Sequence, residues 1–89
     1  MTISARQQGA NAPADGVALD LEGLKCPLPV LRARKALRTL APGQLLIVRC
    51  TDPLAAIDIP HLVNETGDAL EGQAHDGRGL VFYIRRRQP

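Results

Sequence analysis

The hydrophobic pattern opens with a strand and a helix separated by a tight turn. Residues 17–21 alternate apolar and polar positions, as a half-buried strand does, and Gly23 permits a sharp turn after them. Apolar residues then recur at helical spacing, at Val30, Ala33, Leu37 and Leu40. Ala41-Pro42-Gly43 marks the end of this predicted helix.

A second strand and a second helix follow. Residues 44–50 are a nearly continuous apolar run, which is typical of a central strand. Because a helical crossover connects it to the first strand, we expect two parallel neighbours that end at the same edge of the sheet. Asp52 is predicted to be the N-cap of a helix with Pro53 at its first position and Gly67 as its C-cap, and Pro60 is expected to kink or split it.

The remaining pattern predicts a β-hairpin. Residues 69–75 and 80–86 have strand character, and residues 76–79 between them form a tight turn. The element order βαβαββ predicts an α+β two-layer sandwich, in which two helices pack on one face of a four-stranded mixed sheet.

Composition indicates one small domain. The chain has 89 residues, 45% of them apolar, and the domain is assigned to residues 17–87. Residues 1–16 lack periodicity and the apolar segment of a secretory signal, so a disordered tail is expected. No apolar run is long enough to span a bilayer, which favours a cytoplasmic protein in which Cys26 and Cys50 form no permanent disulfide.

The run Cys26-Pro27-Leu28-Pro29 is the candidate centre of chemistry. Cys26 stands where the first strand gives way to the first helix, and Pro27 suits the first helical position because its missing N–H costs nothing there. With Cys26 as the cap, unpaired backbone N–H groups and the helix dipole are expected to lower the pKa of its thiol moderately.

The chemistry open to this thiol is restricted by Pro29. A dithiol redox centre would need a second cysteine there. A single nucleophilic sulfur can take a group from one partner and hold it for the next, and sulfane sulfur bound as a persulfide is a suitable cargo that needs no cofactor. The alternative is a buried, inert cysteine in a non-catalytic interaction or regulatory module, with RNA binding as one such role.

Several motifs in one order, from Leu19 to about Arg86, resemble the TusA/SirA-like sulfur-carrier family. This family shares a short strand, a Cys-Pro-x-Pro at the first helix and an Asp-Pro that opens the second. The matching residues here are LEGLKCPLPV at 21–30, Pro42-Gly43, Thr51-Asp52-Pro53, Asp58-Ile59-Pro60, Thr66-Gly67 and Phe82-Tyr83-Ile84-Arg85.

The resemblance implies a βαβαββ sandwich that relays sulfane sulfur through Cys26. A cysteine desulfurase or another persulfide donor protein would load this residue, and a downstream acceptor protein would receive the sulfur. Such relays feed thiolation of transfer RNA, assembly of molybdenum cofactor or, in some bacteria, oxidation of sulfur compounds. The resemblance therefore implies a sulfurtransferase only in the sense of a carrier.

Cys50 departs from the family, whose members commonly carry a small or acidic residue before the Asp-Pro segment. On the same sheet edge as Cys26, it could resolve a persulfide there as a disulfide with release of sulfide. The interpretation favoured here is a buried and inert strand-end cysteine. Lys25 and Asp52 are the other expected neighbours of the site, and Asp52 is expected to cap its helix rather than to catalyse.

The charged residues favour protein partners over nucleic acid. With Lys25, four cations of the first helix are candidates for docking an acidic partner surface, although most such runs are solvated helix faces: Arg32, Arg34, Lys35 and Arg38. Arg78 and residues 85–87 suggest a second basic patch, but the net charge of +2, the 2% aromatic content and the lack of an RNA-module signature make nucleic acid an unfavoured partner.

His61 and His75 lack zinc-site spacing with the cysteines, and neither is predicted to act as a base for Cys26.

Overall fold

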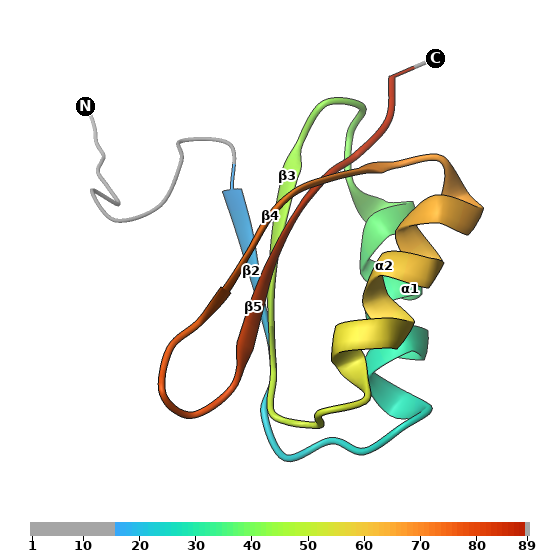
Figure 1. Cartoon of the computed structure of the whole chain (residues 1–89). Coiled ribbons are helices and arrows are strands. Elements are labelled where there is room, and N and C mark those ends of the chain that lie inside the picture. Colours follow the sequence, from blue (N-terminus) through green and yellow to red (C-terminus); the bar gives the residue numbers. More distant parts are fainter. Residues whose placement is uncertain (1–15, 89) are drawn as a thin grey trace.

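The computed structural model describes residues 16–88 and shows two layers, a sheet and a pair of helices that both lie on one of its faces (Figure 1). In chain order the elements are β2 (Gly16–Leu21), α1 (Leu28–Thr39), β3 (Leu45–Cys50), α2 (Ala55–Thr66), β4 (Ala69–His75) and β5 (Leu80–Arg85). The predicted βαβαββ order and α+β two-layer architecture are therefore confirmed. The tail was expected at 1–16; its residues 1–15 lie outside the described residues, and Gly16 is instead the first residue of β2.

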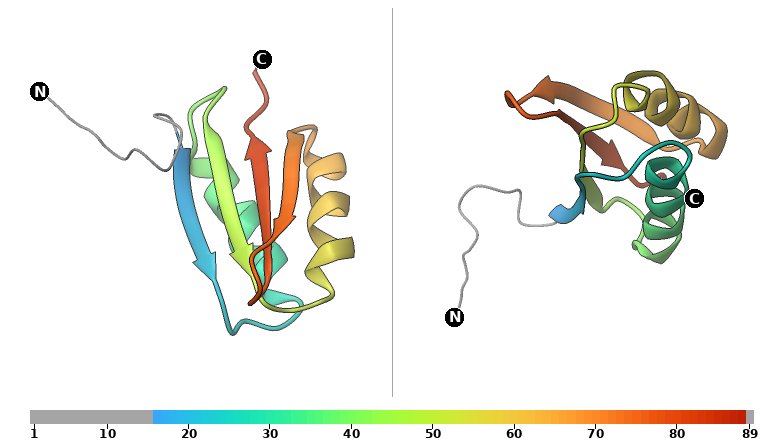
Figure 2. Two further views of the ribbon diagram at one scale, coloured as in Figure 1. Left: turned by 60° about the vertical axis from the view of Figure 1, so that its left-hand side comes forward. Right: turned by 90° about the horizontal axis from the view of Figure 1, so that it is seen from below.

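The sheet is mixed, with the strand order β2-β3-β5-β4 (Figure 2). β2 and β3 are parallel, whereas β5 runs antiparallel to both of its neighbours, β3 and β4. β3 is thus an interior strand, as its continuous apolar run predicts. Because Leu21 lies opposite Cys50 in the register, β2 and β3 end at the same edge of the sheet.

Alternate residues of the strands form the core against the helices. Phe82 on β5 is completely buried and is the largest fully buried side chain in the described part of the chain. The residues around it are aliphatic, apart from the thiol of Cys50, and come from both layers; they include Leu21, Ala33, Leu37, Leu46, Val48, Ile59, Leu62 and Ile84. Period-2 burial on the strands and helical spacing on α1 and α2 therefore produce a single core.

The start of α2 differs from the prediction. The N-cap of the helix is Leu54, so α2 begins two residues after the predicted first position, Pro53. A tighter turn comes first, in which the N–H of Ala55 donates to the carbonyl of Asp52, three residues back, over 3.0 Å. The Asp52 side chain accepts the N–H of Leu54 within this turn and is not the N-cap of α2.

α2 runs past Pro60 as one helix, so of the two predicted outcomes, a kink or a division into two short pieces, the division is wrong. Pro60 removes a single hydrogen bond, the one that an N–H would make to the carbonyl of Ala56. Ala56 is exposed, which lets water satisfy that carbonyl. At the other end, Gly67 caps the helix with φ of 80°, as predicted from its freedom to adopt the left-handed region.

Candidate functional site

Two loops meet at the sheet edge where β2 and β3 end. The N–H of Gly23, after β2, donates to Oγ1 of Thr51, after β3, over 2.8 Å. The N–H of Cys26 donates to Oδ2 of Asp52 over 2.6 Å. The predicted proximity of Cys26 to the segment after β3 is therefore confirmed, and its cause is the shared edge of two parallel strands.

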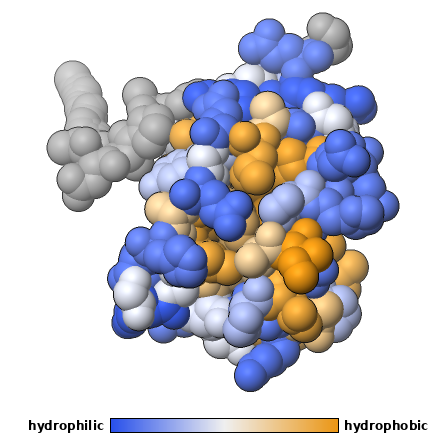
Figure 3. Space-filling model, viewed as in Figure 1, coloured by the Kyte–Doolittle hydropathy of each residue, from blue (hydrophilic) through white to orange (hydrophobic). Residues whose placement is uncertain are grey.

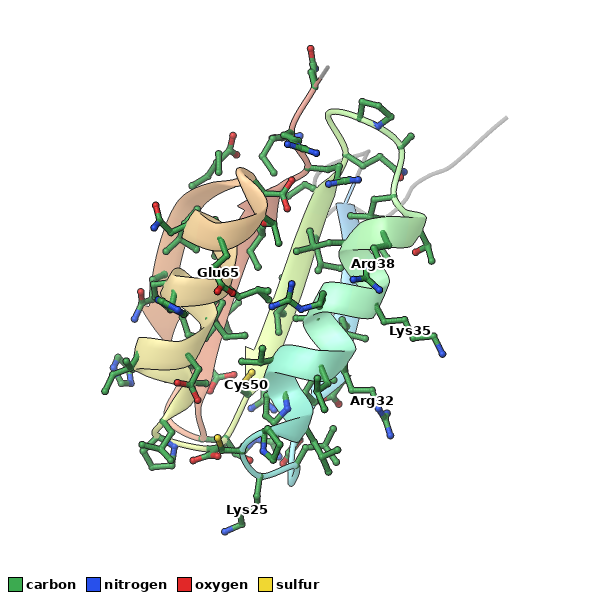
Figure 4. The ribbon with its side chains drawn as sticks, turned by 90° about the vertical axis from the view of Figure 1, so that its right-hand side faces the viewer. Lys25, Arg32, Lys35, Arg38, Cys50 and Glu65 are labelled. Carbon is green, nitrogen blue, oxygen red and sulfur yellow. The ribbon has the colours of Figure 1, made fainter. Side chains whose placement is uncertain are left out.

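Asp52 ties the backbone of Cys26 to the start of α2. Its second carboxylate oxygen accepts the N–H of Leu54 over 3.1 Å, and the residue is only 8% exposed. The hydrogen bond from Cys26, followed by the one from Leu54, holds the pKa of Asp52 below its usual range, and the charge of nearby Lys25 adds to this. Lys25 itself projects from the loop into solvent (Figure 4). Asp52 thus positions the cysteine, and no contact places it in direct reach of the sulfur.

Cys26 lies just outside α1. The N-cap is Pro27 and the first helical residue is Leu28, so the prediction that Cys26 caps the helix is wrong, and no side chain caps this end by a hydrogen bond. The N–H of Leu28 already donates to the carbonyl of Lys25 over 2.8 Å. Pro29, buried at the second helical position, has no N–H. The first amides of the helix are therefore not offered to the sulfur.

The thiol of Cys26 is exposed and meets a carboxylate. Its Sγ donates to Oδ2 of Asp58, on α2, over 3.4 Å. This hydrogen bond, then partial loss of hydration, then the negative charges of Asp58 and Asp52 raise the pKa of the Cys26 thiol. The predicted lowering of the pKa is therefore wrong, because the group beside the sulfur is an anion and not a helix amide.

A groove of about 220 Å³ runs between the two helices beside the thiol. It is lined by Cys26 and Pro27 before α1, by Val30 of α1, and by Asp58, His61, Leu62 and Glu65 of α2. Within the groove, Nε2 of His61 lies 3.7 Å from Oε2 of Glu65. The groove is therefore apolar in part, with its polar side chains supplied by one face of α2.

The acidic side of this groove was missed by the sequence reasoning. Asp58, His61 and Glu65 are three and four residues apart, the spacing that places side chains on one helix face. Asp58 also belongs to the Asp-Ile-Pro motif that resembles the sulfur-carrier family, so a signal was present. His61 was not predicted to act as a base for Cys26, and the structure places it in the lining of the same groove as Cys26.

Cys50 is completely buried at the end of β3, beneath the helices (Figure 4). Burial, and after it the charge of Asp52, raises the pKa of this thiol to about 11. Both cysteines are free. The prediction that Cys50 is buried at the end of a strand is confirmed. That its thiol is inert stays a prediction.

The cations of α1 do not act as one group. Arg34 forms an ion pair of 3.2 Å with Glu65, so it bridges the helices. Arg32 and Lys35 are exposed on the side of α1 away from α2 (Figure 4). Arg38 is exposed in the last turn of α1. The basic face that remains for a partner therefore consists of Arg32, Lys35 and Arg38.

The second basic patch suggested by the sequence is largely neutralised. Three of its arginines form ion pairs with acids, namely Arg78 with Glu22, Arg85 with Glu71 and Arg86 with Asp68. Arg78 also lies in the hairpin turn that precedes β5, whereas residues 85–87 lie where that strand ends. These arginines therefore occupy two separate places and carry little unpaired charge.

Exposed apolar side chains surround the start of both helices. We call Leu28, Leu31, Leu54 and Ile57 the apolar rim; their exposed fractions range from 41% for Leu28 to 69% for Ile57. Figure 3 shows apolar surface gathered at the lower right, the end of the molecule where the helices begin. The rim belongs to the same end of the fold as Cys26.

Residues 16–88 contain neither a metal-binding cluster nor a membrane-spanning helix. No group of three or more His, Cys, Asp or Glu side chains there is arranged to hold a metal ion. No helix in that stretch has the length and apolar character needed to cross a membrane.

Comparison with known proteins shows that this chain is similar to sulfur carrier proteins. The family model described as Sulfurtransferase TusA matches residues 17–86. The chain is 40% identical over 68 residues to the sulfur carrier protein TusA of Allochromatium vinosum, covering 76% of this chain and 90% of the relative. It is 41% identical over 69 residues to the protein of that name from Pseudomonas putida, covering 78% of this chain and 86% of the relative.

A solved structure has the same fold. The crystal structure of a SirA-like protein from Desulfitobacterium hafniense matches with a TM-score of 0.70 and 25% sequence identity. The match covers 80% of this chain and 97% of the other chain. The SirA-like protein therefore shares the mixed sheet with two helices.

Proposed function

Because the chain belongs to the TusA family of sulfur carrier proteins, we propose that it carries sulfane sulfur as a persulfide on Cys26 between a donor and an acceptor protein. The exposure of the Cys26 thiol beside the groove carries this proposal, since two different proteins must reach the carried sulfur. The relay requires a free thiol, which suits the reducing cytoplasm, and both cysteines are free.

The transfer needs no oxidant or cofactor. The Cys26 thiolate attacks the terminal sulfur of a persulfide on the donor, for example a cysteine desulfurase. A new S–S bond forms at Cys26 while the S–S bond of the donor breaks, and the electron pair and the proton lost by Cys26 end on the donor thiol. The acceptor thiolate repeats the same displacement on the Cys26 persulfide, which regenerates the thiol and completes one of the relays implied by the family.

The surfaces around Cys26 support partners that are proteins. The apolar rim is suited to the buried centre of a protein interface, and the basic face beside it is suited to an acidic partner surface. Stacking on RNA bases requires exposed aromatic rings, and of the two aromatic residues in the chain Phe82 is buried.

Intact mass spectrometry tests sulfur carriage directly. After incubation with a cysteine desulfurase and cysteine, the protein is expected to gain the mass of one sulfur atom, and dithiothreitol is expected to remove it. The control is the same incubation without cysteine. If desulfurases and other persulfide donors all leave the mass unchanged, the carrier function is contradicted and the interaction module is favoured.

Salt and charge reversal test the docking role of the basic face. In the variant Arg32→Glu/Lys35→Glu, sulfur transfer from the donor is expected to slow by roughly tenfold at low ionic strength, because electrostatic steering is lost. In wild type, the rate should also fall as salt rises from about 0.05 to 0.5 M, since the Debye length shortens.

The matched control is Arg78→Glu, which reverses a charge in the hairpin turn. This variant should keep the wild-type rate. A transfer rate that does not respond to salt or to reversal of Arg32 and Lys35 would refute the docking role.

A further inference from the structure

The charged groups that act directly on the Cys26 thiol are carboxylates, whereas the side chain of Lys25 projects into solvent. Asp58 contacts the sulfur, Asp52 holds the backbone of the same residue, and the lining of the groove contains no lysine or arginine. Glu65 is already paired with Arg34. Within residues 16–88, Asp58 has no cationic partner, and its carboxylate faces the groove beside the thiol.

We propose that this groove is the docking site for a lysine or arginine side chain that the sulfur donor or acceptor presents beside its own reactive cysteine. Pairing of that cation with Asp58 would free the Cys26 sulfur from its hydrogen bond. The inference rests on the proposed carrier function and adds the chemistry by which the partner is recognised.

The lining of the groove suits both the stem and the charged head of such a side chain. Lysine and arginine carry an aliphatic stem, for which Pro27, Val30 and Leu62 provide apolar contacts. The charged head then reaches Asp58, where a charge-assisted hydrogen bond is stronger than the one from the thiol. A partner seated on the apolar rim would exclude water from this pair, and lower dielectric strengthens the attraction between its charges.

The pairing couples docking to reactivity. In the free protein the Asp58 carboxylate keeps the pKa of Cys26 raised, so at neutral pH less of the thiol is in the reactive thiolate form. A cation on Asp58 cancels that charge and takes the carboxylate away from the thiol. Cys26 then reacts faster with the persulfide of a docked partner than with an electrophile that does not dock.

Labelling with a pair of charged reagents tests this inference without sulfur transfer. Two methanethiosulfonates are used, one carrying a trimethylammonium group and one a sulfonate group. In each reaction the Cys26 thiolate forms an S–S bond to the reagent sulfur and methanesulfinate leaves. Both reagents consume the same thiolate, so the ratio of their rates reports the charge beside Cys26 and is independent of the thiolate fraction.

We expect the cationic reagent to be favoured over the anionic one more strongly at Cys26 than at N-acetylcysteine amide. In Asp58→Asn this ratio should fall by about fivefold, because a unit charge a few ångströms away changes the two rates in opposite directions. The absolute rates at pH 7 should rise in the same variant, since its thiol pKa is lower. Mass spectrometry of peptides assigns the adduct to Cys26.

The matched control is Glu71→Gln, which neutralises a carboxylate on β4, at the sheet edge opposite β2. It should leave the ratio unchanged. A wild-type ratio equal to or below that of the free amide, or one that Asp58→Asn does not lower, would overturn the inference. Loss of sulfur loading with this ratio intact would instead contradict the carrier function, so the two failures are distinguishable.

Discussion

Replacement of Cys26 by serine is expected to abolish sulfur loading completely. A serine hydroxyl cannot form the S–S bond of a persulfide, and Cys26 is the exposed thiol of the two cysteines. The substitution changes one atom at a surface position, so the fold should be retained. Intact mass spectrometry after incubation with a desulfurase and cysteine should therefore show no added sulfur in Cys26→Ser.

Cys50→Ser provides the matched control for this experiment. Cys50 is completely buried, and its pKa of about 11 leaves almost no thiolate at neutral pH, so it should neither accept sulfur nor remove it from Cys26. The variant is expected to gain one sulfur as wild type does. A longer lifetime of the Cys26 persulfide in Cys50→Ser would show instead that Cys50 resolves it, and sulfur gain by Cys26→Ser would move the carrier site elsewhere.

Truncation of Phe82 to alanine is expected to cause the largest loss of stability, about 3–5 kcal/mol. The side chain is completely buried between the sheet and the helices, and its removal leaves a cavity in a core that is otherwise aliphatic. Because small domains are stable by only about 5–15 kcal/mol, the loss removes a large part of the total. Urea unfolding followed by circular dichroism should show a midpoint lowered by about 3 M.

Tyr83→Ala is the matched control, since it truncates the adjacent aromatic residue of β5. Tyr83 points to the sheet face opposite the helices and is only half-buried. The loss of stability should therefore be clearly smaller than for Phe82→Ala. Equal losses for both variants would mean that the helix side of the sheet is not the main source of stability.

Much of the fold follows from local patterns. Period-2 alternation in residues 17–21 and the apolar run at 44–50 locate two strands, and the helix between them makes these strands parallel. That topology brings the loop of Cys26 to the loop of Asp52, as the hydrogen bond between them shows. The burial of Cys50 also follows, because the end of an apolar central strand buries its side chain.

The errors lie where a few hydrogen bonds decide between close alternatives. Pro27 rather than Cys26 is the N-cap of α1, because the carbonyl of Lys25 takes the N–H of Leu28 in a turn before the helix. Pro60 fits in the middle of α2 because it removes only the hydrogen bond to the carbonyl of Ala56, which is exposed to water. Hydrophobic periodicity does not resolve the first residue of a helix to within one or two positions.

By itself the sequence determined the element order, the parallel pair of strands and the cysteine at their shared edge, because periodicity and turn residues act over short stretches of chain. Only the tertiary structure decided the state of that cysteine. Asp58 is 32 residues away from Cys26 in the chain, and it meets the thiol because α1 and α2 pack side by side with this face of α2 turned toward the sulfur. The rotation of a packed helix depends on all the side chains of the core, so the contact that raises the pKa of Cys26 exists only in the folded protein.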